Sequence, residues 1–103
     1  IKVGVFPLLK NKPELVAKAR QVYDMLKPHF ACFYDEAGAI GKRYARQDEI
    51  GTPYCVTIDF DTLGENAELA DTVTLRERDT TRQSRVSLSD LLGRLKIGLS
   101  LPL

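Results

Sequence analysis

The chain has few of the residues that define a metal site, a disulfide framework or a membrane span. It holds two cysteines, one histidine and no tryptophan in 103 residues. Cys32 and Cys55 show none of the Cys/His spacings of a zinc site, so no structural zinc is expected. No apolar run approaches the ~18 residues of a membrane helix, and we expect neither a membrane partner nor a signal peptide. Both thiols are expected to be reduced core residues, which favours a reducing, cytoplasmic location.

An excess of charge of one sign is also lacking. The chain has 15 Lys and Arg against 14 Asp and Glu, a net charge of +1. The field of the whole molecule therefore does not indicate a nucleic-acid partner, and any basic surface must be local. The length suits one domain over residues 1–103. Because the chain starts at Ile1 in an apolar strand pattern, we expect it to be a piece of a longer protein.

Apolar periodicity and chain breakers predict alternating strands and helices. Period-two runs predict strands over residues 2–6, 31–34, 54–60, 71–78 and 83–86. An apolar stripe predicts a helix between Pro13 and Pro28, and Ile40–Ile50 reads as a second helix that Gly51 ends. Ser87 and Asp90 have capping-box spacing for a last helix. The order β-α-β-α-β-β-β-α predicts an α/β fold with a mixed sheet.

No set of catalytic side chains is evident. Asp59 and Asp61 project to the same side of an extended chain, as a pair that holds Mg²⁺ or performs acid–base chemistry would. A third ligand is missing, so a small α/β enzyme is a weaker hypothesis. The simpler interpretation is that these carboxylates cap a turn or pair with an arginine.

The basic residues fall into two groups. Lys42, Arg43 and Arg46 lie on the predicted second helix, where a solvated face with an Arg46–Glu49 pair is the simpler interpretation. Arg76 and Arg78 alternate along a strand, acidic residues separate them, and Arg82 and Arg85 follow.

This mixture of signs suits the reading of base edges in single-stranded RNA. Arginine donates to phosphates and to base acceptors, and aspartate accepts from the amine of cytosine. Tyr44 and Phe60 could stack on bases, although core packing is the simpler role for both.

Two stretches carry a resemblance to a known family. GAIGKRYARQDEIGTPYCVTIDFDT and DTVTLRERDTTRQ closely resemble the C-terminal anticodon-binding domain of class II, dimeric glycyl-tRNA synthetases, over about Lys2 to Leu95. The resemblance implies a mixed five-stranded sheet flanked by three helices. It also implies binding to the anticodon loop of glycine tRNA, whose second and third anticodon bases are cytosines. The parent would be a homodimeric ligase that uses ATP and Mg in a separate catalytic domain. The fragment itself would be non-catalytic, monomeric and without a cofactor.

The resemblance also implies which residues contact RNA. The positions that match the family's basic helix, third strand and hairpin are Lys42, Arg43, Arg46, Asp59, Arg76, Glu77, Arg78, Asp79 and Arg82. Of these we expect Arg76, Arg78, Asp79 and Asp59 to contact bases or backbone, and Glu77 to pair with an arginine on the core side. An alternative is the same fold used for protein interaction, as in the accessory subunit of mitochondrial DNA polymerase.

Overall fold

The computed structural model describes residues 1–100 of the chain. Its elements, in order, are β1 (Val3–Pro7), α1 (Pro13–Leu26), β2 (Cys32–Tyr34), α2 (Ile40–Ile50), β3 (Tyr54–Ile58), the short 3₁₀ helix η1 (Ala67–Leu69), β4 (Thr72–Glu77), β5 (Gln83–Ser87) and α3 (Leu88–Ser100). The predicted order of strands and longer helices is confirmed, and η1 lies in a segment expected to be an irregular polar loop.

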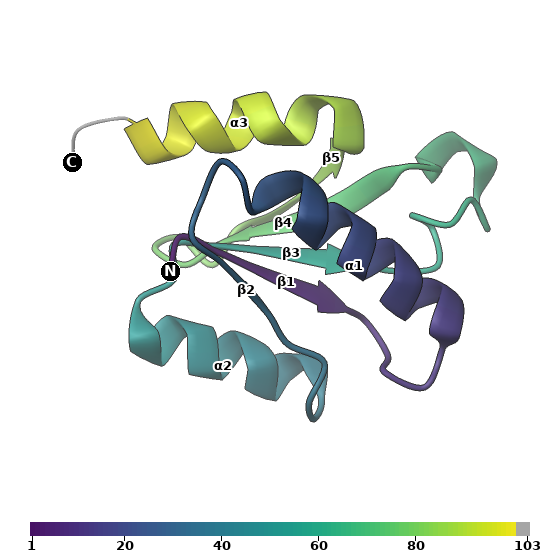
Figure 1. Cartoon of the computed structure of the whole chain (residues 1–103), viewed down its shortest axis with the longest axis horizontal. Helices are drawn as coiled ribbons and strands as arrows, with labels where there is room; N and C mark the ends of the chain where they lie inside the picture. The colour runs from purple at the N-terminus through teal and green to yellow at the C-terminus, as the bar shows by residue number, and fades with distance from the viewer. Residues whose placement is uncertain (101–103) are drawn as a thin grey trace.

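The strands form one mixed sheet, as predicted. Their spatial order is β2-β1-β3-β4-β5. β1 runs parallel to both β2 and β3, whereas β4 runs antiparallel to β3 and β5. Helices α1 and α3 lie on one face of the sheet and α2 lies on the other (Figure 1). The fold class is therefore the three-layer α/β arrangement with three helices.

The hydrophobic core lies between the sheet and the pair α1 and α3. Its buried residues are Val3, Val5, Leu15, Ala19, Val22, Leu26, Val56, Ile58, Val73, Leu75, Val86, Leu91 and Leu95. Burying each Val, Leu or Ile side chain contributes roughly 1.5–3 kcal/mol. This face is thus the main source of stability, and the α2 face is the more polar of the two.

Helix α2 ends where the sequence predicts. Gly51 has the left-handed φ of 84°, and its N–H donates to the carbonyls of Gln47 and Asp48. The Thr52 hydroxyl then donates to Oε1 of Gln47 over 2.6 Å, with both side chains buried. Two interlocked contacts therefore fix the direction in which the chain enters β3.

Strand β3 is shorter than the predicted run over residues 54–60, because a turn replaces its last two residues. Oδ1 of Asp59 accepts hydrogen bonds from the backbone N–H and the hydroxyl of Thr62, both at 3.1 Å. Such local bonds of an aspartate compete with ladder pairing and end the strand.

Neither cysteine is part of a disulfide or of a cluster that could hold a metal ion within residues 1–100. Both cysteines are free thiols; Cys55 is buried and Cys32 is half-buried. Burial raises the pKa of the Cys55 thiol to about 12, which keeps it protonated and inert. Within residues 1–100, no three His, Cys, Asp or Glu side chains gather in a way that could hold a metal ion. None of the helices in that range is long and apolar enough to cross a membrane.

Candidate nucleic-acid interface

Strands β4 and β5 present a polar face on the side of the sheet that carries α2. Val73 and Leu75 of β4 point into the core, so the alternate residues of both strands point the other way. The register pairs Thr72 with Ser87, Thr74 with Arg85 and Arg76 with Gln83. We call these six residues the open face. In the part of the chain that the structure describes, no helix spans this side of β5 (Figure 1).

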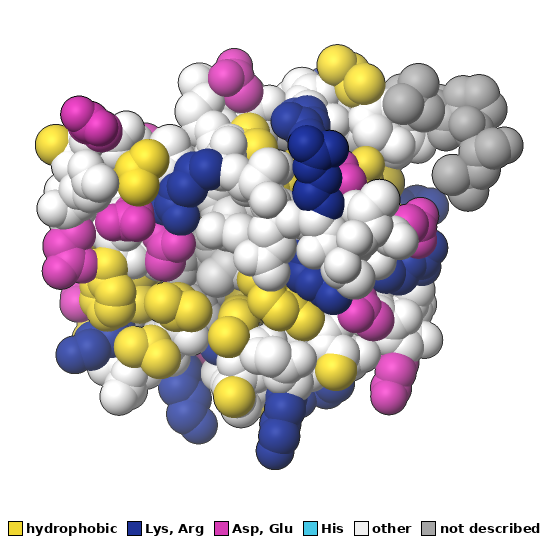
Figure 2. Space-filling view, turned by 180° about the vertical axis from the view of Figure 1, so that it is seen from behind, with side chains coloured by type: hydrophobic (Ala, Val, Ile, Leu, Met, Phe, Trp, Pro, Cys, Tyr) yellow, Lys and Arg dark blue, Asp and Glu magenta, His cyan; other side chains and the backbone are white. Residues whose placement is uncertain are grey.

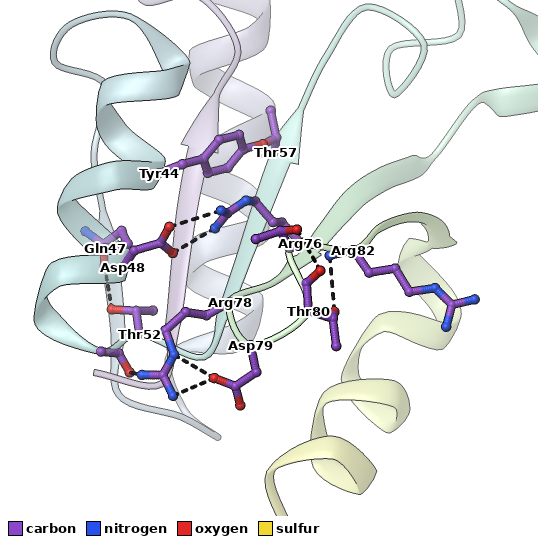
Figure 3. A network of polar contacts seen from close by, with 12 residues as sticks. Tyr44, Gln47, Asp48, Thr52, Thr57, Arg76, Arg78, Asp79, Thr80 and Arg82 are labelled. Carbon is purple, nitrogen blue, oxygen red and sulfur yellow. Dashed lines mark hydrogen bonds and ion pairs between the residues drawn. The ribbon is translucent and has the colours of Figure 1, made fainter.

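Arg76 lies where the open face meets α2. Its guanidinium donates to Oδ1 and Oδ2 of Asp48 over 2.8 and 3.0 Å, from the sheet to the helix (Figure 3). The same group lies 4.9 Å from the centre of the Tyr44 ring, and the Tyr44 hydroxyl bonds to Thr57. The side chain of Arg76 is 11% exposed. Arg76 therefore fixes α2 on the sheet, and few of its donors are free for RNA.

Arg78 and Asp79 lie at the tip of the β4–β5 hairpin, next to the end of α2. Nε of Arg78 donates to Asp79 over 2.9 Å, and Nη1 donates to the carbonyl of Gly51 over 2.7 Å. Asp79 is exposed, and both residues line an open groove of about 420 Å³ that Lys2 and Tyr54 also line. This pair is thus accessible to a ligand, as the sequence predicts for a binding residue.

Within residues 1–100 Glu77 forms no ion pair with an arginine, so that expectation is wrong. Its carboxylate accepts from the hydroxyl of Thr80 over 3.1 Å, and the same hydroxyl accepts from the backbone N–H of Arg82. Glu77 therefore shapes the hairpin turn. The turn predicted at residues 79–82 is confirmed, with Thr81 at a left-handed φ of 56°.

Asp59 is held by Arg85, across the open face from β5 to the end of β3. Nη2 of Arg85 donates to Oδ1 over 2.6 Å and Nη1 donates to Oδ2 over 2.7 Å. Burial opposes ionisation of Asp59, but the bonds from Arg85 and Thr62 outweigh it, and the pKa of this carboxyl lies below its ordinary value. The arginine pairing considered for Asp59 in the sequence is thus present, and the pair is ionised at neutral pH.

Arg43 is buried, and its assignment to the RNA-contacting residues is corrected. The residue is 1% exposed, and its guanidinium donates to the backbone carbonyls of Pro7, Leu8 and Asp35. Pro7 is the last residue of β1, and Leu8 and Asp35 directly follow β1 and β2. Arg43 satisfies their carbonyls from α2, which is a structural role.

The remaining basic residues stay near the surface. Arg46 donates to Asp35 over 2.8 Å and to the carbonyl of Ala37, and the ion pairs found among the described residues do not include the alternative Arg46–Glu49 pair. Lys42 and Arg82 are exposed and take part in none of the ion pairs found within residues 1–100. Arg82 extends away from the Arg76–Asp48 and Arg78–Asp79 pairs (Figure 3).

Cations and anions are interspersed over the surface. The rear view in Figure 2 shows Lys and Arg side chains scattered among Asp and Glu, with apolar side chains between them across the lower half. This agrees with the net charge of +1. A ligand on this surface would be recognised by individual hydrogen bonds more than by a broad positive field.

Comparison with known proteins decides the family. The model of the anticodon binding domain family matches residues 2–97. The chain belongs to this family.

The chain also resembles curated proteins. It is 55% identical over 95 residues to a glycine–tRNA ligase of Streptomyces coelicolor, covering 92% of this chain and 19% of that protein. A glycine–tRNA ligase of Clostridium kluyveri is 53% identical over 95 residues, with 92% and 19% covered. One of Borreliella afzelii is 50% identical over 95 residues, with 92% and 20% covered. The chain thus spans about a fifth of the length of these relatives.

Two important residues of this anticodon-binding domain were not among the predicted site residues. Asp48 is the partner of Arg76, and Arg85 is the partner of Asp59. The alternation Gln83, Arg85, Ser87 already places Arg85 on one face of its strand. Only the register of the hairpin shows that this face is the one that Thr72 and Thr74 share.

Proposed function

We propose that this chain is the anticodon-binding part of a glycine–tRNA ligase and that it binds the anticodon loop of glycine tRNA. The family and the names of the relatives support this assignment. The observation that carries it within the structure is the open face, a row of hydrogen-bonding side chains on two strands that no helix of the described residues spans. Single-stranded bases are recognised by such surfaces, because their Watson–Crick edges are free.

The rest of the proposal concerns the parent protein. A ligase of this kind would activate glycine with ATP and Mg in a separate catalytic domain, as a homodimer in the cytoplasm. This domain would hold the anticodon while the catalytic domain holds the acceptor end. Two contacts on one tRNA raise the affinity of both through effective concentration. Modest affinity of the domain alone is therefore the expected result.

The test is binding of the chain to matched anticodon stem-loops. Fluorescence anisotropy is measured with a stem-loop that carries the two cytosines and with one in which both are uracils. We expect about tenfold or greater preference for the cytosines, because a bidentate base contact discriminates by roughly 1–3 kcal/mol. Affinity should also fall with added salt, since phosphate contacts release counterions. Equal binding of both stem-loops would refute the specificity.

One observation favours a second candidate, a protein-interaction role. Arg46, Arg76, Arg78 and Arg85 are each paired with an aspartate of the same chain, which leaves fewer free cations than a phosphate-binding surface usually has. In that case RNA binding would be weak and independent of both sequence and salt. The salt series of the same experiment therefore separates the two functions.

A further inference from the structure

Arg85 uses all of its donor groups within the protein. Nε donates to the hydroxyl of Thr72 over 2.7 Å. Nη1 donates to Oδ2 of Asp59 and, over 3.3 Å, to the hydroxyl of Thr74, while Nη2 donates to Oδ1 of Asp59 and the carbonyl of Thr72. A guanidinium has five N–H groups, so none is left for a ligand. Arg85 is consequently a residue that positions others.

Arg85 positions Asp59 through both carboxylate oxygens. These two oxygens differ in the number of hydrogen bonds that they accept. Oδ1 accepts from Arg85, from the backbone N–H of Thr62 and from the Thr62 hydroxyl. Oδ2 accepts from Arg85 alone among the described residues. A carboxylate oxygen has two lone pairs in its plane, so Oδ2 retains an acceptor site. The Asp59 side chain is 20% exposed.

Thr74 supplies a donor beside that acceptor. Its hydroxyl oxygen and Oδ2 of Asp59 both accept from the same nitrogen of Arg85, at 3.3 and 2.7 Å. Within residues 1–100 no acceptor is bound to the Thr74 hydroxyl hydrogen. Thr72 differs, because its hydroxyl donates to the carbonyl of Leu69 over 2.5 Å. A free acceptor on Asp59 and a free donor on Thr74 of the open face thus both contact the same nitrogen of Arg85.

We propose that Asp59 Oδ2 and the Thr74 hydroxyl, aligned by Arg85, read the amine and the adjacent ring nitrogen of one anticodon cytosine. Cytosine presents an amine donor there, and next to it the ring nitrogen is an acceptor. Uracil presents the reverse order, a carbonyl oxygen and an N–H. The carbonyl oxygen would face the carboxylate oxygen of Asp59, acceptor against acceptor, whereas the Thr74 hydroxyl can turn to accept from the N–H. Asp59 therefore discriminates between the two bases, and Thr74 aligns either of them. This inference rests on the proposed function, since it names the base group that the same interface recognises.

The test replaces the donor without changing its shape. Thr74→Val is isosteric and removes the hydroxyl, and its affinity is measured for stem-loops with cytosine, uracil or 2-pyrimidinone at each of the two positions. The affinity of this variant for the stem-loop with both cytosines should fall by about tenfold, or about 1.4 kcal/mol. The cytosine-to-uracil ratio should fall in Asp59→Asn, at one position, because its amide can turn to donate to uracil. At that position 2-pyrimidinone, which lacks the amine, should bind the wild-type chain about as weakly as uracil.

The matched control is Ser84→Ala, which removes a hydroxyl from the opposite face of β5. Ser84 pairs in register with Leu75, a residue of the core. Its loss should leave both the affinity and the cytosine-to-uracil ratio unchanged. If Asp59→Asn fails to fold, Thr74→Val and the 2-pyrimidinone stem-loop decide the question without it.

The possible failures are distinguishable. A wild-type chain that binds all stem-loops equally refutes the proposed function and this inference together. A wild-type chain that prefers cytosine, with the same affinity in folded Thr74→Val, refutes only the inference. Tight binding of 2-pyrimidinone at both positions refutes it as well, because the amine would then contribute nothing.

Discussion

Arg43 lies in an environment that is unusual for an arginine. A long cation on an amphipathic helix normally lies in water, yet this one is 1% exposed and bonds to three backbone carbonyls. Its Nε is buried and has no hydrogen-bond partner among the described residues. Burial lowers the pKa of Arg43, and the charge of Asp35 opposes that shift. Arg43 therefore connects α2 to the ends of β1 and β2.

We predict that alanine substitution of two neighbouring basic residues changes the free energy of unfolding by very different amounts. Arg43→Ala should lower the free energy of unfolding by about 3 kcal/mol or more, because buried carbonyls lose charged donors. The control Lys42→Ala changes an exposed side chain and should stay within about 0.5 kcal/mol of the wild type. Urea unfolding followed by circular dichroism measures both. Similar midpoints for the two variants would contradict the structural role of Arg43.

The end of α2 depends on the backbone conformation of Gly51. Gly51 has a left-handed φ of 84° and accepts from Arg78, which connects the helix end to the hairpin of β4 and β5. A Cβ at this glycine would lie 3.1 Å from Nη1 of that arginine. Conformation and space both favour glycine here, and the accessible Arg78–Asp79 pair depends on it.

Two glycine-to-alanine changes should therefore have opposite effects on stability. Gly51→Ala should lower the free energy of unfolding by about 1–2 kcal/mol, because alanine strains the left-handed conformation and displaces Arg78. Gly93→Ala should raise it by about 0.5–1 kcal/mol, because Gly93 lies inside α3 with open space around its Cβ position. Thermal unfolding of both variants tests this. A stabilising Gly51→Ala would show that the left-handed end is not required.

Over the whole molecule, the nearly equal numbers of acidic and basic residues are partly matched in specific ion pairs. Aspartates at positions 35, 48 and 59 each accept from an arginine that lies on another element. For Asp48 the bonds from Arg76 lower the pKa; for Asp35 and Asp59 burial opposes ionisation and the arginine bonds outweigh it. These pairs connect α2, β4, β5 and the ends of β2 and β3. They also leave the open face polar without making it strongly basic.

The stability of the chain should consequently decrease in acid. The pKa of all three carboxyls is lower in the folded chain than the ordinary 3.8, so the unfolded chain binds protons first as the pH falls. The stabilisation from these three ion pairs is fully present at pH values above the ordinary pKa. It is lost as the pH falls through the pKa values that the carboxyls have in the folded chain. Urea unfolding at pH 7, 5, 4 and 3 should give a free energy that decreases below about pH 4. Asp48→Asn should show a shallower decrease, and a constant free energy down to pH 3 would contradict the prediction.

The sequence by itself determined the order of elements, the bounds of α2, the glycine that ends it and the family. These features follow from local causes, namely apolar period, chain breakers and recognisable motifs. Only the tertiary structure decided which charges meet. It buried Arg43, paired Arg76 with Asp48, and placed Arg85 against Asp59. The two ion pairs join residues 28 and 26 positions apart, and Arg43 lies 36 and 35 positions from the carbonyls of Pro7 and Leu8. These contacts depend on strand register and helix packing, which no local pattern contains.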